Sequence, residues 1–154
     1  MSPPDPEPSS IAEFVTFQAG GLSYSLDITH VREIRRWTSA TPLPHAPADV
    51  LGVMNLRGTV IPIYDLSARF GRGPTPDNPR NVIVVAMVGM RMVGLLVQAV
   101  SEILSVPRAA IQPTPDIGSD ATRQNVTGMI ALEDGMTRVI DLAAVIQPPN
   151  RQVA

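Results

Sequence analysis

The stretch GVMNLRGTVIPIYDL (Gly52–Leu66) places Asn-Leu-Arg-Gly inside an otherwise apolar run. Two strands joined by a turn at Arg57-Gly58 account for this pattern, because glycine supplies a positive φ at no steric cost. The run closes with Asp65 and Leu66, and an Asp before a short apolar segment is a good helix N-cap. The stretch therefore predicts a β-hairpin followed by a short helical turn.

The same pattern returns near the end of the chain, as GMIALEDGMTRVIDL (Gly128–Leu142), in a gapless alignment that sets Gly128 over Gly52. A second pair of stretches also aligns without gaps, with FVTFQAGGLSYSLDITHVREI (Phe14–Ile34) lying over IVVAMVGMRMVGLLVQAVSEI (Ile83–Ile103). The one gap that the two blocks together need falls in the polar segment 107–127. Because both blocks recur in the same order, the sequence indicates an internal duplication.

Each repeat contains the same predicted parts, which are two hairpins and a closing helical turn. We expect the four hairpin turns at Gly20-Gly21, Gly89-Met90, Arg57-Gly58 and Asp134-Gly135. Asp141 should cap a helical turn as Asp65 does.

Two segments of the first half are harder to assign. We expect a further short helix over 47–51, with Pro47 at its start and Gly52 beyond its end. The segment DITHVREIRRW (27–37) fits either an amphipathic helix or a strand. Its second-half counterpart is more β-branched, which favours a strand for both.

Short strands with turns at intervals of about 8 to 12 residues are typical of small antiparallel barrels, and two repeats predict two barrels side by side. We expect one foldable unit over 11–146, built from repeats at roughly 11–70 and 81–146. A linker rich in Pro and Gly, 71–80, joins them. The Pro- and Ser-rich residues 1–10 and residues 147–154 are expected to be flexible tails. Strand exchange between the barrels is left open by the pattern.

The composition excludes several classes of protein. The chain has 44% hydrophobic and 17% charged residues, which is typical of a globular protein. A net charge of −2 and 4% aromatic residues do not favour a nucleic-acid partner. There is no Cys and no signal peptide, and the apolar stretch 82–97 is interrupted by Arg91 and Gly89. These features predict a cytoplasmic protein that does not insert into the membrane.

The residues offer little catalytic chemistry. His30 and His45 are the only histidines, and neither lies at metal-ligand spacing from other ligands. Asp65 and Asp141 are better explained as helix caps than as a carboxylate pair. We therefore predict no catalytic residue, no metal and no cofactor. An enzyme that uses a cleft between the barrels remains an alternative, and its signature is an apolar cleft with several converging ionisable groups.

Arg57 is the residue that the hairpin alone does not explain. A lone Arg at a turn usually points into water. The second repeat has Glu133 at the equivalent position, so the duplicated fold does not require Arg there. The small neighbours Gly52 and Gly58 leave the backbone approachable, and Arg in such a setting is a common anchor of protein–protein contacts.

Several motifs, taken in order, resemble the CheW family of bacterial chemotaxis coupling proteins. They are VREI, PLPHAP, GVMNLRGTVIPIYDL, VGLLVQAVSEIL and TGMIALEDGMTRVIDL, and together they span about residues 11–146. The resemblance implies an all-β fold of two SH3-like five-stranded antiparallel barrels packed side by side, with short helical turns. One departure is Gln98, where the family often has Asp.

The resemblance also implies a non-enzymatic adaptor. Its partners would be the cytoplasmic tips of methyl-accepting chemoreceptors, bound in a groove between the barrels, and the regulatory domain of the CheA histidine kinase. An alternative within the family is the scaffold of a kinase array that serves surface motility or gene regulation. Carried across by motif, the receptor-binding residues are Val31, Glu33, Gly52, Asn55 and Arg57. We expect Glu33 and Arg57 to form an ion pair, and no motif marks the residues that contact the kinase.

Overall fold

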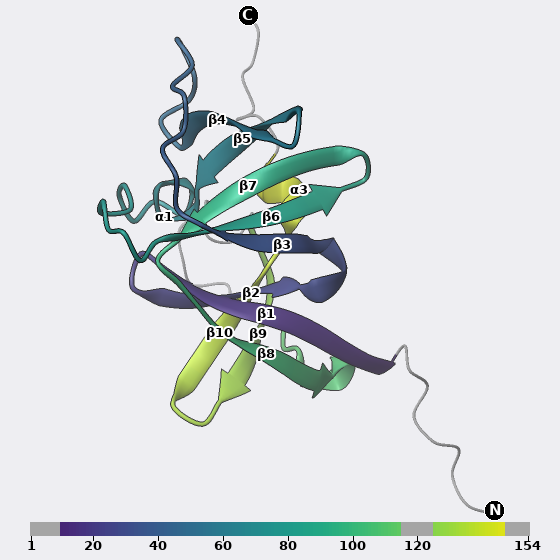
Figure 1. Ribbon diagram of the computed structural model, residues 1–154. Coiled ribbons are helices and arrows are strands. Elements are labelled where there is room, and N and C mark those ends of the chain that lie inside the picture. Colours follow the sequence, from purple (N-terminus) through teal and green to yellow (C-terminus); the bar gives the residue numbers. More distant parts are fainter. Residues whose placement is uncertain (1–9, 115–124, 147–154) are drawn as a thin grey trace, which may run out of the picture.

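The computed structural model describes residues 10–114 and 125–146 of the 154-residue chain and shows two five-stranded sheets with a few short helices (Figure 1). The predicted all-β fold of two barrels is confirmed. The expectations for residues 1–9 and 147–154 fall outside the described residues. The elements are β1 (Ile11–Ala19), β2 (Leu22–Asp27), η2 (Ile28–His30), β3 (Val31–Arg36), β4 (Val50–Leu56), β5 (Thr59–Asp65), α1 (Leu66–Arg69), β6 (Val82–Val88), β7 (Arg91–Val97), β8 (Ala99–Pro107), η3 (Arg108–Ala110), β9 (Val126–Leu132), β10 (Gly135–Ile140) and α3 (Leu142–Val145).

The two sheets exchange hairpins between the repeats. Barrel A has the strand order β8-β1-β2-β10-β9, and barrel B has the order β3-β6-β7-β5-β4. The first hairpin of the chain, β1–β2, thus joins three strands of the second repeat, while β6–β7 joins three strands of the first. Figure 1 shows this crossing, with β1 and β2 beside β8, β9 and β10. The barrels therefore do not coincide with the two halves of the sequence.

Each sheet also contains one parallel pair, which the expectation of antiparallel barrels did not include. These pairs are β2 with β10 and β5 with β7. Strands joined by a tight turn must run antiparallel, but these pairs come from separate parts of the chain and are free of that constraint. In barrel A the parallel seam is closed by buried hydroxyls, with Ser25 Oγ 2.8 Å from Thr137 Oγ1. In barrel B the equivalent positions are Gly94 and Ile61, so apolar packing replaces the hydroxyl pair.

The largest group of buried apolar side chains, which we call the shared core, is formed by both barrels. It draws equivalent positions from the two repeats, with large aromatic groups in the first and aliphatic ones in the second. Tyr24 stacks on Phe70 at 4.3 Å between ring centroids, and this contact joins β2 of barrel A to the end of α1. The buried members of the shared core are Phe17, Ala19, Tyr24, Leu26, Tyr64, Leu66, Phe70, Val84, Ala86, Val93, Leu95, Val97, Ile140, Leu142, Val145 and Ile146.

The local predictions have mixed outcomes. The turns at Gly20-Gly21, Gly89-Met90 and Arg57-Gly58 are confirmed. Segment 27–37 forms a short 3₁₀ turn and then strand β3, as favoured.

The carboxylates of Asp65 and Asp141 accept hydrogen bonds from the backbone N–H groups of Ala68 and Ala144, so both predicted N-caps are confirmed. In addition, the buried Asp65 carboxylate accepts from the backbone N–H of Thr75 at 2.8 Å. This bond fixes the linker 71–80, which has no regular secondary structure, against barrel B.

Two local predictions are wrong. No helix forms over 47–51; the Val50 N–H donates to the Pro47 carbonyl at 2.9 Å in a single turn, and β4 begins at Val50. Strand pairing with β5 outweighs the helix signal there. The last hairpin turns at Glu133-Asp134, and Gly135 begins β10 opposite Leu132. The Asp134-Gly135 pair predicted this turn one position too late. Alignment with Arg57-Gly58 of the first repeat gives the observed position, Glu133-Asp134.

We predict that neither half of the chain folds alone. Each sheet needs a hairpin from the other repeat, and the shared core needs both. Fragments 11–70 and 81–146 should each lack a cooperative thermal transition by circular dichroism. As a control, a full chain cut by a protease within the linker 71–80 should keep its transition, because the exchanged hairpins hold the halves together. A stable, well-dispersed NMR spectrum from either fragment would contradict this view of the fold.

Candidate partner-binding site

The Glu33 and Arg57 side chains meet across the open side of barrel B. Glu33 lies on β3 and Arg57 in the β4–β5 turn, and β3 and β4 are the two edge strands of this sheet. The Arg57 guanidinium donates to Glu33 Oε1, and Arg35 lies 3.4 Å from Glu33 Oε2. The predicted ion pair is therefore present, and it joins the two ends of a sheet that curls toward closure.

The shape of the turn holds Arg57 in place. Arg57 has φ 49° and Gly58 has φ 89°, which are the two successive positive values that a tight two-residue hairpin requires. Asn55 supports this geometry, since its Oδ1 accepts from the Gly58 N–H at 2.8 Å. A non-glycine residue with positive φ is uncommon. The second repeat has Ala131 in place of Asn55, so this turn is a property of the first repeat alone.

The ion pair is asymmetric in its exposure. The Arg57 side chain is 70% exposed, whereas that of Glu33 is 27% exposed. The hydrogen bond from Arg57 lowers the pKa of Glu33, and Arg35 adds to this effect. The same bond raises the pKa of Arg57. The arrangement presents a guanidinium at the surface, with a partly covered carboxylate that fixes its position.

Gly52 is buried and supports the backbone beneath this turn. Its φ is 147°, and a Cβ there would lie 2.1 Å from the Thr41 carbonyl oxygen. Thr41 and Val53 exchange backbone hydrogen bonds of 2.8 and 2.9 Å across it. Gly128 has the same role in the second repeat, where a Cβ would lie 2.8 Å from the carbonyl oxygen of Gln112. The glycine is thus a requirement of the duplicated fold, and the structure does not bring it to the surface.

Val31 lies at the start of β3, close to Glu33 along the strand, and packs partly against the shared core. The structure therefore brings together Glu33, Asn55 and Arg57, places Val31 two residues before Glu33 on the same strand, and buries Gly52. Gln98, the departure from the family pattern, lies elsewhere. Its Oε1 accepts from the Gly21 N–H at 3.0 Å and supports the β1–β2 turn.

A cavity of about 330 Å³ is lined by His30, which directly precedes Val31, and by residues of both barrels. Val88 of barrel B lines it together with residues of barrel A such as Phe14 and Ile140. Sequence reasoning did not locate this cavity, because its walls come from several separate segments. Most of its lining belongs to barrel A and the segments that adjoin its strands.

The cavity contains ionisable groups, but its carboxylates are engaged in structural bonds. Asp141 caps α3, and Asp27 Oδ1 accepts from the N–H and hydroxyl of Thr29 at 3.0 and 2.8 Å. Within residues 10–114 and 125–146, no group of three or more His, Cys, Asp or Glu side chains is placed to hold a metal ion. In the same part of the chain, no helix is both long and apolar enough to span a bilayer.

Comparison with known proteins decides the family. Residues 13–149 match the family model described as the CheW-like domain. The chain belongs to the CheW-like family. It is 50% identical to the chemotaxis protein CheW of Rhizobium meliloti (strain 1021) over 142 residues, which is 92% of each chain. It is 33% identical to the chemotaxis protein CheW of Klebsiella aerogenes over 134 residues, covering 87% of this chain and 81% of that one.

The fold agrees with this assignment. The crystal structure of the scaffolding protein TtCheW from Thermoanaerobacter tengcongensis superposes with a TM-score of 0.83 at 29% identity, covering 91% of this chain and 95% of that chain. Membership of this family makes the CheW-like chain a non-enzymatic scaffold in chemotaxis signalling. The alternative of an enzyme that works in the cleft between the barrels is therefore set aside.

We predict that the Glu33 carboxyl titrates below its usual value near 4.5. Its pKa is lowered by bonds to the ionised form, so the contribution of the pair to stability is complete above the usual pKa and is lost as the pH falls through the folded pKa. Carboxyl chemical shifts followed by NMR should show this value rising toward normal in Arg57→Ala. A smaller rise is expected in Arg35→Ala, because that bond is the weaker one. A Glu33 titration unchanged by Arg57→Ala would contradict the pairing.

Proposed function

We propose that this CheW-like protein couples the cytoplasmic tips of chemoreceptors to a CheA-type histidine kinase, so that receptor state reaches kinase activity. The proposal places it in the cytoplasm, recruited to receptor arrays at the membrane. Its support is the family assignment together with the exposed guanidinium of Arg57, which Glu33 fixes across the edge strands of barrel B. The cavity lined by His30 and Val88 adds a hollow with both polar and apolar walls.

The observation that carries the proposal is the restriction of this arrangement to one repeat. Both repeats form the same hairpin, yet only the first has the Asn55-supported turn, the positive φ at Arg57 and the pairing with Glu33. The equivalent turn in barrel A carries Glu133 and Asp134. A feature that the fold does not need in duplicate is a reasonable candidate for recognition, and an immobilised Arg is well suited to that role.

The coupling role is tested by reconstitution. We expect the purified chain to stimulate autophosphorylation of a CheA-type kinase in the presence of receptor cytoplasmic fragments, and to have little effect when either partner is omitted. We also expect direct binding to each partner by titration calorimetry. Absence of binding to both would overturn the proposed function.

Arg57→Ala is predicted to weaken binding of the receptor fragment by about tenfold or more, as expected for an interfacial hot spot. Binding of the kinase and the melting temperature should change little, because exposed ion pairs contribute weakly to stability. Receptor and kinase titrations beside a thermal melt measure all three. Arg36→Ala, which removes an exposed Arg from the same strand β3 as Glu33, is the matched control and should bind normally.

Exchanging the charges of Glu33 and Arg57 tests whether Arg57 contacts the receptor or only pairs with Glu33. In the double variant Glu33→Arg with Arg57→Glu the ion pair can form again, but the exposed charge is reversed. If Arg57 contacts the receptor, the double variant should bind as poorly as Arg57→Ala. Recovery of full binding would show that only the pairing matters, and full binding by Arg57→Ala itself would remove Arg57 from the site.

A further inference from the structure

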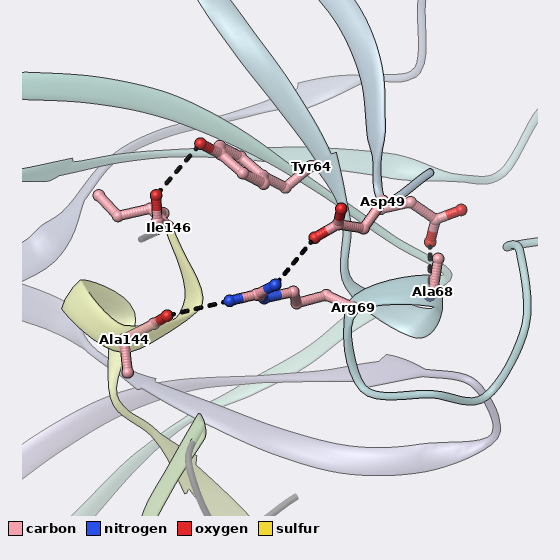
Figure 2. Close-up of polar contacts among 7 residues, drawn as sticks. Asp49, Tyr64, Ala68, Arg69, Ala144 and Ile146 are labelled. Carbon is pink, nitrogen blue, oxygen red and sulfur yellow. Dashed lines mark hydrogen bonds and ion pairs between the residues drawn. The ribbon is translucent and has the colours of Figure 1, made fainter. Parts of the chain in front are cut away.

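We propose that Asp49, Arg69 and the Ala144 carbonyl form a strap that fixes the orientation of barrel B relative to the closing helix of barrel A. Arg69 is the last residue of α1, and its Nη1 lies 3.4 Å from Asp49 Oδ2. Its Nη2 donates to the Ala144 carbonyl of α3 at 3.3 Å. Figure 2 shows Arg69 extended between Asp49 on one side and Ala144 on the other.

The strap is well shielded from solvent, in contrast to the pair at Arg57. The Arg69 and Asp49 side chains are 19% and 15% exposed. Asp49 is itself fixed to barrel B, since its carbonyl accepts from the N–H of Asp65 at 2.7 Å. A guanidinium offers several donors in a rigid plane, which suits it to hold two acceptors on different elements at once. The strap is thus anchored on barrel B and reaches barrel A through one side chain.

A second side chain of the first repeat also donates a hydrogen bond to the end of α3. The Tyr64 hydroxyl on β5 donates to the Ile146 carbonyl at 3.3 Å, and this contact is buried (Figure 2). The last carbonyls of a helix lack intrahelical partners. Two backbone carbonyls at the end of α3 are therefore bound by side chains of the first repeat.

The second repeat forms its own hairpin and helical turn without the two charged strap residues. In the alignment that sets Gly128 over Gly52, Asn125 replaces Asp49 and Val145 replaces Arg69. The backbone bond is nevertheless kept, since the Asp141 N–H donates to the Asn125 carbonyl at 2.8 Å. The charged partners are thus absent together from one repeat and present together in the other.

The ends of the two helices differ in the same way. The Ala68 carbonyl of α1 accepts from the N–H of Gly71, whose φ of 77° is the left-handed conformation usual after a helix. Ala144, the equivalent of Ala68, has its carbonyl bound by Arg69. The Ala144 carbonyl thus has a partner on barrel B, whereas the Ala68 carbonyl has one within its own repeat.

The expected function of the strap is positioning. The proposed receptor residues lie on barrel B, so a fixed orientation of the barrels holds them at a defined angle to every surface on barrel A. Loss of the strap should leave each partner's own contacts intact but loosen the coupling between them. The coupling part of this inference rests on the proposed function, whereas the orientation itself can be measured on the protein alone.

The orientation is tested by a distance between two labels. The chain has no Cys, so Met90→Cys and Met136→Cys provide two unique sites on barrels B and A. Both side chains are exposed, at 95% and 50%. Pulsed electron paramagnetic resonance should give a narrow distance distribution in the otherwise unaltered chain. We expect Arg69→Met to broaden or shift it, and Arg80→Met, at an exposed linker Arg, to leave it unchanged.

The coupling is tested in the kinase assay. Arg69→Met should reduce receptor-dependent stimulation of the kinase by about fivefold or more, the lower end of typical coupling between sites. Its separate affinities for receptor and kinase should stay within about twofold of the original, a pattern that a merely destabilised protein would not give. If the unaltered chain stimulates no kinase, the proposed function fails, and the label distances alone decide the strap.

A paired variant protects the test against misfolding. Asp49→Asn with Arg69→Val reproduces the second repeat, so no buried charge is left without its partner. It should fold and should match Arg69→Met in both assays. The proposal is overturned if either variant folds and keeps the original distance distribution. Failure of both variants to fold would also overturn it, because the contact would then be structural and not a positioning device.

Discussion

The shared core between the barrels is the constraint on which the rest of the structure depends. It is larger than the buried cluster inside either barrel, and its members come from both repeats. Burial of apolar area is the main driving force of folding, and more buried apolar side chains belong to the shared core than to the other two clusters together. The exchange of hairpins also ties the two repeats together through the backbone, because each sheet contains a hairpin from the other repeat. We therefore expect the two small barrels to fold as one unit.

Duplication alone would give a symmetric joint, and the side chains remove that symmetry. Tyr24 and Phe70 of the first repeat correspond to Val93 and Ile146 of the second. Large groups of the first repeat therefore correspond to smaller groups of the second, and the shared core contains both. Burial raises the pKa of Tyr24, whose ring also lies 5.9 Å from the Arg138 guanidinium carbon. The repeats also differ in polar residues. The alignment of the repeats already shows that both charged strap residues, Asp49 and Arg69, are replaced in the second repeat.

The sequence carried enough information for the class of fold and for part of the site. The duplication predicted two barrels, and the opposite charges of Glu33 and Arg57 predicted the pair that is present. Strand exchange could not be predicted, because the alternation of apolar and polar residues in a hairpin fits the strands of its own repeat and those of the other repeat equally well. The turn at 134–135 and the helix at 47–51 were assigned from turn and cap signals of about 1 kcal/mol, which register along whole strands outweighed. Gly52 was assigned to the receptor-binding group by motif, but its environment shows a backbone role that a linear pattern does not reveal.

The ion pairs of Arg57 and Arg69 differ in what surrounds them, and this difference determines what each can do. The Arg57 side chain is 70% exposed, so water screens its attraction to Glu33 and leaves the guanidinium available to a partner. The Arg69 side chain is 19% exposed and bonded on two sides, so its donors are directed within the protein. Shielding from water strengthens such contacts and also makes a missing partner costly, which favours a single arrangement over a range of them. Barrel B thus carries one arginine suited to recognition and one suited to orientation, at opposite ends of strand β5 along the chain. Because barrel A has neither at the equivalent positions, both arginine contacts are properties of the first repeat, and the second repeat supplies the Ala144 carbonyl to which Arg69 donates.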